Sequence, residues 1–418
     1  MRLELARYPI RSLHFGRETR YADGHLILDL ESLRRLLLVE PTLAEVEIHV
    51  AAPGERTRIL HVADVIEPRW KPPAEGDPYP GSLGPLVQAG AGVTHALDDT
   101  GVVIAARFPS SEEAIIDMCG RASELSRFGR MWNLVVVPRA KDHADPGAFG
   151  LAAMRTGLRA AAYLAGATQG VEPARVERFQ WTPADGRADG LSRIGYFYYV
   201  YSHGIGRQKL FYGRSTRDLT PTAIHPNEPM DGCLVNDGYS KPTKNATHDI
   251  VNHPVIRELY RRHGREIVFA GVVLANHHAA TGEKQATAFL GARLLKHVLG
   301  VDGVVISKDG GGQADVDLML ACTACEKLGL RTVLLAKEET GGEGGALVDM
   351  APEANAIVSV GNCPERIRLT TAMDRVIGGQ EFLGAIQGDV AGTVELPVQN
   401  IIGAIDPIGG SRLAGRPA

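Results

Sequence analysis

A polar segment in the middle of the chain, residues 220–263, holds most of the side chains that could do chemistry. It is rich in Pro, Asn, Asp, Gly and Thr, and eight of the 14 histidines fall between His203 and His297. A loop this long is usually functional or disordered, and the histidines favour function. Histidine and aspartate suit proton transfer near neutral pH, and cysteine and threonine are nucleophiles. The candidate catalytic residues are Asp231, Cys233, Thr243, Asn245, Thr247, His248 and Asp249.

The same segment suggests a metal site. His248 and Asp249 are adjacent, and His253 follows five residues after His248. Two histidines do not complete a first coordination shell, and histidines at this spacing in a loop have no fixed geometry. A divalent metal held by His248, Asp249 and His253 is therefore one interpretation. A loop fixed by caps and hydrogen bonds is the other.

The elements that must position these residues are clearest after the segment. Apolar runs of strand length alternate with helical patterns, which predicts a parallel sheet covered on both faces. The predicted strands are 267–274, 303–306, 332–335 and 356–360, and the predicted helices are 283–299 and 315–328.

Each of these strands is followed by polar residues. Open α/β sheets bind ligands at the carboxyl ends of their strands, so we expect a site where the central segment meets this edge. The candidate substrate-binding residues are His225, Asn276, His277, Lys308, Glu338 and Asn362.

The whole chain divides into three parts. We expect a β-rich, α+β N-terminal half at residues 1–219, with a helix over 148–165, followed by the central segment 220–263. Residues 264–418 form an α/β domain of doubly wound, flavodoxin-like type. The 418 residues are enough for two or three domains.

Composition excludes several classes of protein. A net charge of −4 gives no electrostatic argument for nucleic acid as a partner. No apolar run approaches the ~20 residues of a membrane span, and the N-terminus has no secretory signal. Five cysteines do not form a disulfide framework in a chain this long. We expect a cytoplasmic enzyme with a small-molecule substrate, which assembles as a homo-oligomer.

Several phrases resemble the proprotein subunit of glycine, sarcosine and betaine reductase component B, and they run in order along nearly the whole chain. No single phrase is specific, but the collinear set indicates common descent. The phrases include MRLEL at 1–5, DVIEPR at 64–69, IIDM at 115–118, AAAYL at 160–164, MDG at 230–232, NHPVI at 252–256 and DGVVIS at 302–307. The resemblance implies a precursor that is cut into two subunits, the second beginning with a pyruvoyl group. It also implies a partner subunit that carries selenocysteine.

The chain departs from the family where that group is made. The family has a cysteine shortly before a Lys-Asn pair, and the corresponding stretch here is Lys241-Pro242-Thr243-Lys244-Asn245. Proline has no side-chain nucleophile for an acyl shift. A shift of the alignment by one or two residues would bring Ser240 or Thr243 to the site. A serine there could still give a pyruvoyl group, and a threonine the homologous 2-oxobutyryl group, but a cysteine-derived pyruvoyl group is not expected.

Three functions remain open. The first is a component B-like protein that acts on a small amine or amino-acid derivative. The second is a stand-alone hydrolase or lyase of a small C–N compound, which uses the central segment with a metal or with a threonine freed as an N-terminal nucleophile. The third is a binding subunit without catalysis.

Overall fold

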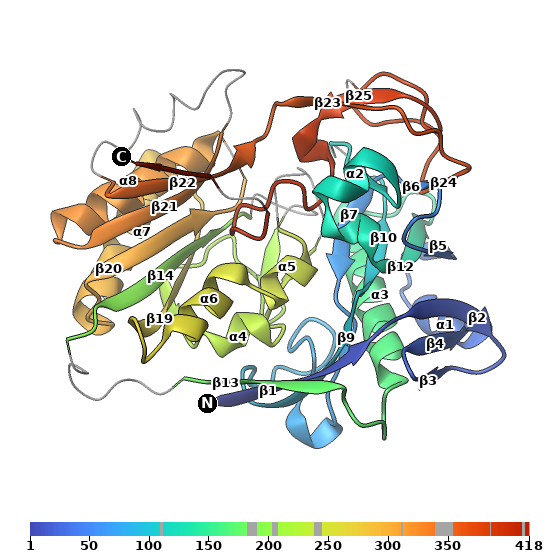
Figure 1. Cartoon of the computed structure of the whole chain (residues 1–418), viewed down its shortest axis with the longest axis horizontal. Helices are drawn as coiled ribbons and strands as arrows, with labels where there is room; N and C mark the ends of the chain where they lie inside the picture. Colours follow the sequence, from blue (N-terminus) through green and yellow to red (C-terminus); the bar gives the residue numbers. More distant parts are fainter. Residues whose placement is uncertain are drawn as a thin grey trace.

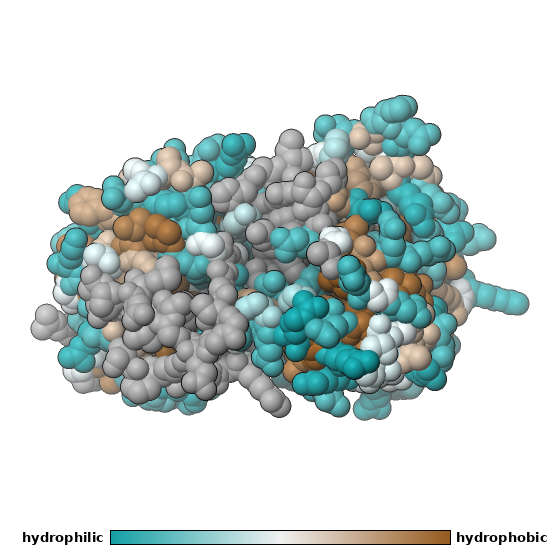
Figure 2. Space-filling view, turned by 90° about the horizontal axis from the view of Figure 1, so that it is seen from above, coloured by the Kyte–Doolittle hydropathy of each residue, from teal (hydrophilic) through white to brown (hydrophobic). Residues whose placement is uncertain are grey.

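The computed structural model of the protein has a mixed α/β fold (Figure 1). The structure describes residues 1–108, 112–181, 190–202, 208–237, 245–310, 312–338, 354–384, 386–411 and 414–417. Among these residues, no helix is long and apolar enough to span a bilayer. The face seen in Figure 2 is mostly hydrophilic, with separate small apolar patches.

A seven-stranded sheet organises the part of the molecule at the left of Figure 1. Five of its strands are parallel, and β17 and β26 pair antiparallel at the two edges. In spatial order the strands are β17 (Thr222–Ile224), β19 (Val268–Asn276), β14 (Arg193–Val200), β20 (Gly303–Lys308), β21 (Arg331–Glu338), β22 (Ala356–Asn362) and β26 (Ala414–Pro417). Numbered along the chain, the parallel strands run 2-1-3-4-5. The strand order therefore reverses between β14 and β20.

Helices cover both faces of this sheet because its central strands are apolar on both sides. On β14, Phe197 and Tyr199 pack under one layer of helices, whereas Tyr196 and Tyr198 pack under the other. The first layer holds α7 (Thr281–Arg293), a π-helical turn at Leu294–Val298, and α8 (Gln313–Lys327). The second holds α4 (Asn227–Met230), α5 (Thr247–Val251) and α6 (Pro254–Arg262).

Two four-stranded sheets and a long helix form most of the N-terminal part. The helix α3 (Pro146–Gly166) begins with Asp145, whose side chain accepts a hydrogen bond from the Ala148 N–H, and with proline at its first position. One sheet has the order β13 (Arg175–Gln180), β1 (Arg2–Pro9), β9 (Gly92–Asp98) and β8 (Arg69–Trp70). The other has the order β5 (Leu43–Ala51), β12 (Trp132–Ala140), β10 (Thr100–Ala105) and β7 (Val62–Ile66).

Smaller elements complete the chain. The helices are α1 (Leu30–Leu37) and α2 (Gly120–Leu125). The strands are β2 (Ser12–Gly16), β3 (Arg20–Ala22), β4 (His25–Asp29), β6 (Thr57–Ile59), β11 (Ile116–Asp117), β15 (Lys209–Phe211), β16 (Arg214–Ser215), β18 (Leu234–Asn236), β23 (Arg366–Leu369), β24 (Arg375–Ile377) and β25 (Val394–Pro397).

The predicted mixed α/β class, the helix near 148–165 and the four strands after the central segment are confirmed. One relation differs from the expected division of the chain. The aromatic strand β14 precedes residue 219, yet it is a central strand of the sheet formed with residues after 264. Its pairing with distant strands cannot be read from local periodicity.

Candidate functional site

The point where the strand order reverses brings the central part of the chain against the sheet edge. Asp309 directly follows β20, and its N–H donates to the Tyr199 carbonyl of β14 at 3.0 Å. Lys209, the first residue of β15, places its Nζ 2.9 Å from Asp309 Oδ2. Ligands of doubly wound sheets bind at such a reversal, so the surroundings of Asp309 are the first candidate site.

Lys209 joins several segments at this point. Its side chain is fully buried, and its Nζ also donates to Asn236 Oδ1 at 2.8 Å and to the Asn245 carbonyl at 3.4 Å. The Asn236 side chain donates in turn to the same Asn245 carbonyl at 2.5 Å. Asn236 and Asn245 are therefore in contact. Residues 238–244, which include the predicted Thr243, lie between them and outside the described residues.

Asn245 extends the contacts to the C-terminal end of the chain. Its Nδ2 donates to Asp406 Oδ1 at 2.5 Å, and burial raises the pKa of Asp406. The N–H groups of Ile408 and Gly410 also donate to this carboxylate. Asn245 Oδ1 is buried and has no hydrogen-bond partner in the described part of the chain.

Asp64 of β7 reaches the same place from the N-terminal part. It accepts hydrogen bonds from the Thr247 N–H at 2.8 Å and the Thr247 hydroxyl at 2.5 Å. Burial raises the pKa of Asp64 to about 6, against the hydrogen bonds from Thr247 and Asn236, which lower it. We call these residues together the switch-point cluster: Asp64, Lys209, Asn236, Asn245, Thr247, Asp309 and Asp406.

Asp231 and Cys233 face other neighbours. Asp231 accepts hydrogen bonds from Lys71 Nζ at 2.6 Å, from the Thr94 hydroxyl at 2.5 Å and from the Gly90 N–H at 2.6 Å. Cys233 lies in the apolar core under β14 and β19, where burial raises the pKa of its thiol well above the usual value. Each side chain thus anchors the start of the central segment to surrounding structure.

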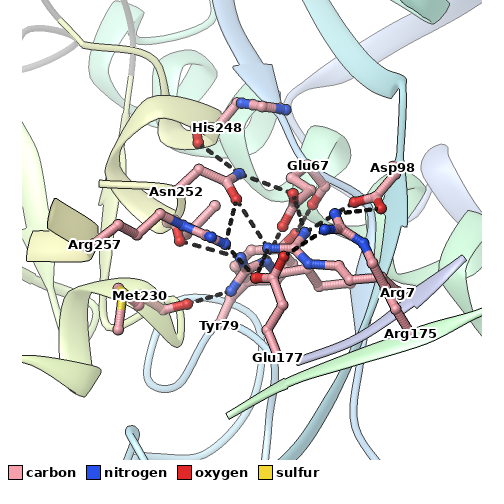
Figure 3. A network of polar contacts seen from close by, with 12 residues as sticks. Arg7, Glu67, Tyr79, Asp98, Arg175, Glu177, Met230, His248, Asn252 and Arg257 are labelled. Atoms are coloured by element: carbon pink, nitrogen blue, oxygen red, sulfur yellow. Dashed lines mark hydrogen bonds and ion pairs between the residues drawn. The ribbon is translucent and has the colours of Figure 1, made fainter. Parts of the chain in front are cut away.

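His248 lies at a separate cleft of about 590 Å³, lined by arginines and carboxylates from β1, β13 and α6 (Figure 3). Arg7 crosses this cleft and pairs with Glu67 at 2.7 Å, while Asn252 bridges Glu67 and the His248 carbonyl. Burial, with Arg127 nearby, lowers the pKa of His248 to about 3. The imidazole is therefore neutral at physiological pH.

The proposed metal ligands do not converge in the structure. Asp249 contacts Arg127 and accepts a hydrogen bond from the Ala246 N–H, which makes it a helix cap. His253 does not line the cleft; its Nε2 lies 3.2 Å from the Tyr196 hydroxyl, and burial lowers its pKa to about 3. Within the described ranges, no three His, Cys, Asp or Glu side chains are grouped as metal ligands.

The predicted substrate-binding residues of the strand ends are buried along one edge. Asn276 at the end of β19 donates to the His277 carbonyl at 2.7 Å, and His277 Nδ1 lies 3.1 Å from Asp317 Oδ2. Burial lowers the pKa of His277. Lys308 Nζ lies 2.6 Å from Asp315 Oδ1. This edge therefore carries both charged and neutral polar groups beside Asp309.

The remaining predicted residues have other neighbours. Glu338 and Asn362 are paired neighbours at the ends of β21 and β22, and Glu338 accepts a hydrogen bond from Ser359 at 2.7 Å. His225 precedes α4, where its ring contacts Trp181 and burial lowers its pKa to about 4. His225 is therefore a neutral packing residue in this arrangement.

Comparison with known proteins decides the family. The family model of glycine/sarcosine/betaine reductase component B subunits matches residues 1–414. The chain belongs to this family. It is 32% identical over 428 residues to the glycine reductase complex component B subunits alpha and beta of Peptoclostridium acidaminophilum, covering 100% of both chains. It is also 32% identical to the sarcosine reductase complex component B subunit alpha of that organism, covering 94% of this chain and 93% of the relative.

The corresponding betaine reductase subunit of Peptoclostridium acidaminophilum is 29% identical over 397 residues, covering 92% of this chain and 89% of the relative. No solved structure matches the chain significantly. The similarity to glycine/sarcosine/betaine reductase component B therefore extends through both the N-terminal part and the sheet domain, and includes the central segment.

Five members of the switch-point cluster were not named as candidate residues from the sequence of this component B family member: Asp64, Lys209, Asn236, Asp309 and Asp406. Asp64, Lys209 and Asp406 come from three distant segments, so no spacing connects them. Asp64 is a charged residue within the otherwise apolar stretch VADVI of β7. A lone charge in a buried strand must find a partner, and this was the available signal.

Proposed function

We propose that the chain is a substrate-binding subunit of a component B-type reductase, acting on a small amine or amino-acid derivative at the switch-point cluster. The proposal is supported by relatives of matching length whose names place them in glycine, sarcosine and betaine reductase complexes. A second reductase subunit as partner, a homo-oligomeric assembly and a cytoplasmic location belong to the same proposal.

The observation that carries this proposal is a surplus of buried acceptor atoms. Asn245 Oδ1, Asp309 Oδ1 and Asn276 Oδ1 are all buried without a hydrogen-bond partner among the residues that the structure describes. Native proteins rarely leave buried oxygens unpaired, because each unpaired group carries a desolvation penalty. An ammonium or amide N–H of a ligand would supply the missing donors, with the other oxygen of Asp309 remaining paired with Lys209 at 2.9 Å.

A flavodoxin-like arrangement of the sheet belongs to the same proposal. Five parallel strands in the order 2-1-3-4-5, with helices on both faces, agree with this type of doubly wound sheet. In such sheets the ligand lies where the order reverses, which is beside Asp309 here. The polar edge of the sheet is thus the expected binding surface.

We further propose that no cysteine-derived pyruvoyl group forms. The family's processed cysteine has no counterpart between Leu234 and Thr247. The nearest cysteine, Cys233, is completely buried in the apolar core, and its thiol is held in the neutral form. The residues present do not fit the group, so no step of a reaction is assigned to it.

A hydrolase or lyase is the second candidate, and one contact favours it. The Thr247 hydroxyl donates to Asp64 at 2.5 Å, and the pKa of Asp64 is about 6. A carboxylate with a pKa near neutrality beside a hydroxyl is suited to general-base activation of a nucleophile. Retained hydrolysis or elimination of a C–N compound by Thr247→Val would exclude this role.

Two measurements test the proposal. Intact mass under denaturing conditions reports cleavage: one mass of 44.8 kDa is expected, and two fragments that part between Asn236 and Thr247 would revive a processed N-terminal group. Calorimetric titration with glycine, sarcosine and betaine then reports binding. We expect at least one to bind, and Asp309→Asn to weaken it at least roughly tenfold, as for loss of a charge-assisted hydrogen bond.

Asp117→Asn is the matched control for the titration. Asp117 is also a buried carboxylate that pairs with a cation, since Arg58 Nε lies 2.7 Å from it, but it belongs to β11 outside the cluster. Both variants lose a buried ion pair, and only Asp309→Asn should change the affinity. Equal affinities for both variants, or no binding of any of the three compounds, would contradict the proposal.

A further inference from the structure

A cleft of about 760 Å³ opens in the N-terminal part, away from the switch-point cluster. It lies at the carboxyl ends of the parallel strands β10 and β12. Strand β7 pairs antiparallel with β10, so its first residues lie at the same edge. The lining includes His61, Arg107, Arg139, Phe149, Gly379 and Glu381. This sheet therefore has its own strand-end cleft, in the position where α/β structures bind ligands.

His61 is fixed at the floor of this cleft in an unusual backbone conformation. Its φ of 55° lies in the left-handed region, which residues other than glycine seldom adopt. The His61 N–H donates to Glu113 Oε1 at 2.9 Å, and the His61 carbonyl accepts from the Ala106 N–H at 2.9 Å. Strained conformations persist when surrounding contacts hold them, and they concentrate at functional sites.

Glu113 also orients the imidazole ring. Its Oε2 lies 3.1 Å from His61 Nδ1, and the carboxylate is fully buried. The angle is too poor for an aligned hydrogen bond, so we regard the contact as electrostatic. Glu113 is held in place because its Oε2 accepts from the Leu383 N–H at 2.7 Å. In the protonated ring both nitrogens are donors, so Nδ1 faces Glu113 and Nε2 can donate its N–H to an oxyanion.

Gly379 lies against the imidazole on its Nε2 side, where any side chain would collide with the ring. A Cβ added at Gly379 would lie 2.2 Å from His61 Nε2, closer than any non-bonded contact allows. The backbone at Gly379 is not in the left-handed region, so its conformation does not require glycine. The requirement is the clearance of the imidazole. Among the residues described, no group hydrogen-bonds to His61 Nε2.

The rim of the cleft supplies positive charge. Arg107 pairs with Glu381 at 2.8 Å, and Arg139 pairs with Glu47 at 2.7 Å. All four side chains are substantially exposed, and exposed ion pairs contribute little to stability. Either guanidinium can therefore turn to a ligand, and the fork of N–H groups in arginine matches the oxygens of carboxylates and phosphates.

We propose that this cleft is a second ligand site of the protein, which binds a small oxyanion between His61 Nε2 and the guanidinium groups of Arg107 and Arg139. The ligand is a carboxylate or a phosphate group, and no bond is made or broken in this step. The site does not depend on the reductase proposal, since it lies on another sheet and uses other residues.

The test is a titration of the full chain, labelled with [¹³C]histidine, with sodium phosphate and separately with sodium acetate at constant ionic strength. The His61 Cε1–Hε1 signal, assigned by its loss in His61→Asn, is expected to shift to saturation with at least one probe. Arg139→Gln is expected to raise the Kd at least roughly tenfold, because a charge-assisted hydrogen bond is lost. Saturation by phosphate only, by acetate only, or by both identifies the group recognised.

His143→Asn provides the control. His143 also has a left-handed backbone, with φ of 61°, but it does not line the cleft, and asparagine tolerates this conformation at both positions. We expect His143→Asn to bind the anion as the wild type does. The proposal is overturned if neither anion shifts the His61 signal, or if Arg139→Gln binds with wild-type affinity. Arg139 is exposed, so its replacement tests the site without unfolding it.

Discussion

Replacing Lys209 by methionine is expected to destabilise the protein strongly. Lys209 and Asp309 are both fully buried, and their charged atoms lie 2.9 Å apart. Methionine keeps much of the volume of the side chain but leaves Asp309 without its countercharge. The hydrogen bonds from Lys209 Nζ to Asn236 and to the Asn245 carbonyl are lost as well.

The loss of unfolding free energy can be estimated from the unpaired Asp309 carboxylate that the substitution leaves in the interior. Removing one member of a buried ion pair typically destabilises a protein by about 3–5 kcal/mol, because the other charge stays buried and unpaired. Replacing both members by apolar residues removes that penalty, so Lys209→Met with Asp309→Leu should be more stable than Lys209→Met alone. Arg366→Met is the control, because its partner Glu395 lies 2.6 Å away at the surface and such pairs contribute about 0–1 kcal/mol.

Urea unfolding at pH 7, followed by tryptophan fluorescence, measures these differences. The Trp181 indole N–H donates to the Phe269 carbonyl of β19 at 2.7 Å, so this residue reports on the sheet that contains the cluster. A change below about 1 kcal/mol for Lys209→Met would refute the reasoning, since that is the range of an exposed pair. A double variant less stable than the single one would refute it too.

Three further outcomes are expected. Burial depresses the folded-state pKa of His253 to about 3. The contribution of the neutral side chain to stability is therefore present above pH 6.5 and is lost as pH falls toward 3. His253→Gln should accordingly flatten the fall in melting temperature between pH 7 and pH 5. Gly291→Ala should destabilise by about 1–3 kcal/mol in urea unfolding, because its Cβ would lie 2.1 Å from a buried phenylalanine ring, whereas Gly282→Ala on the same helix meets open space and should not destabilise. Iodoacetamide should label the partly exposed Cys119 in the folded protein before it labels the fully buried Cys233, as peptide mass spectrometry would show; equal rates would contradict the core position of Cys233.

Local sequence patterns were sufficient to predict most strands of the C-terminal sheet. Strands β19 to β22 are short apolar runs, and the alternation of such runs with helical patterns in the sequence predicted both their existence and their parallel direction. Strand β14 is a run of aromatic residues with high strand propensity, but its partners lie more than 65 residues away in the sequence. Strand pairing over such separations depends on packing of the whole chain, which periodicity does not encode.

For the candidate site too, the sequence predicted some features, whereas others depended on tertiary contacts. Asn245 and Thr247 were named from residue type, and the structure places both in the switch-point cluster beside Asp309. Asp231 and His248 come from the same segment, yet they face different neighbours because short helices turn their side chains away. Residue chemistry thus selected a segment, whereas the direction of each side chain depended on tertiary contacts.

The position of β14 has a consequence for any cut in the central segment. Strand β14 precedes residues 238–244, and its two neighbours, β19 and β20, follow them. A nick there would leave two polypeptides that share one continuous sheet, with backbone hydrogen bonds on both sides of β14 and a common apolar interior. The two pieces would co-elute as one complex in gel filtration and would separate only in denaturant. Neither piece made alone could assemble the interior, so the two would have to originate from one translated chain or fold in each other's presence.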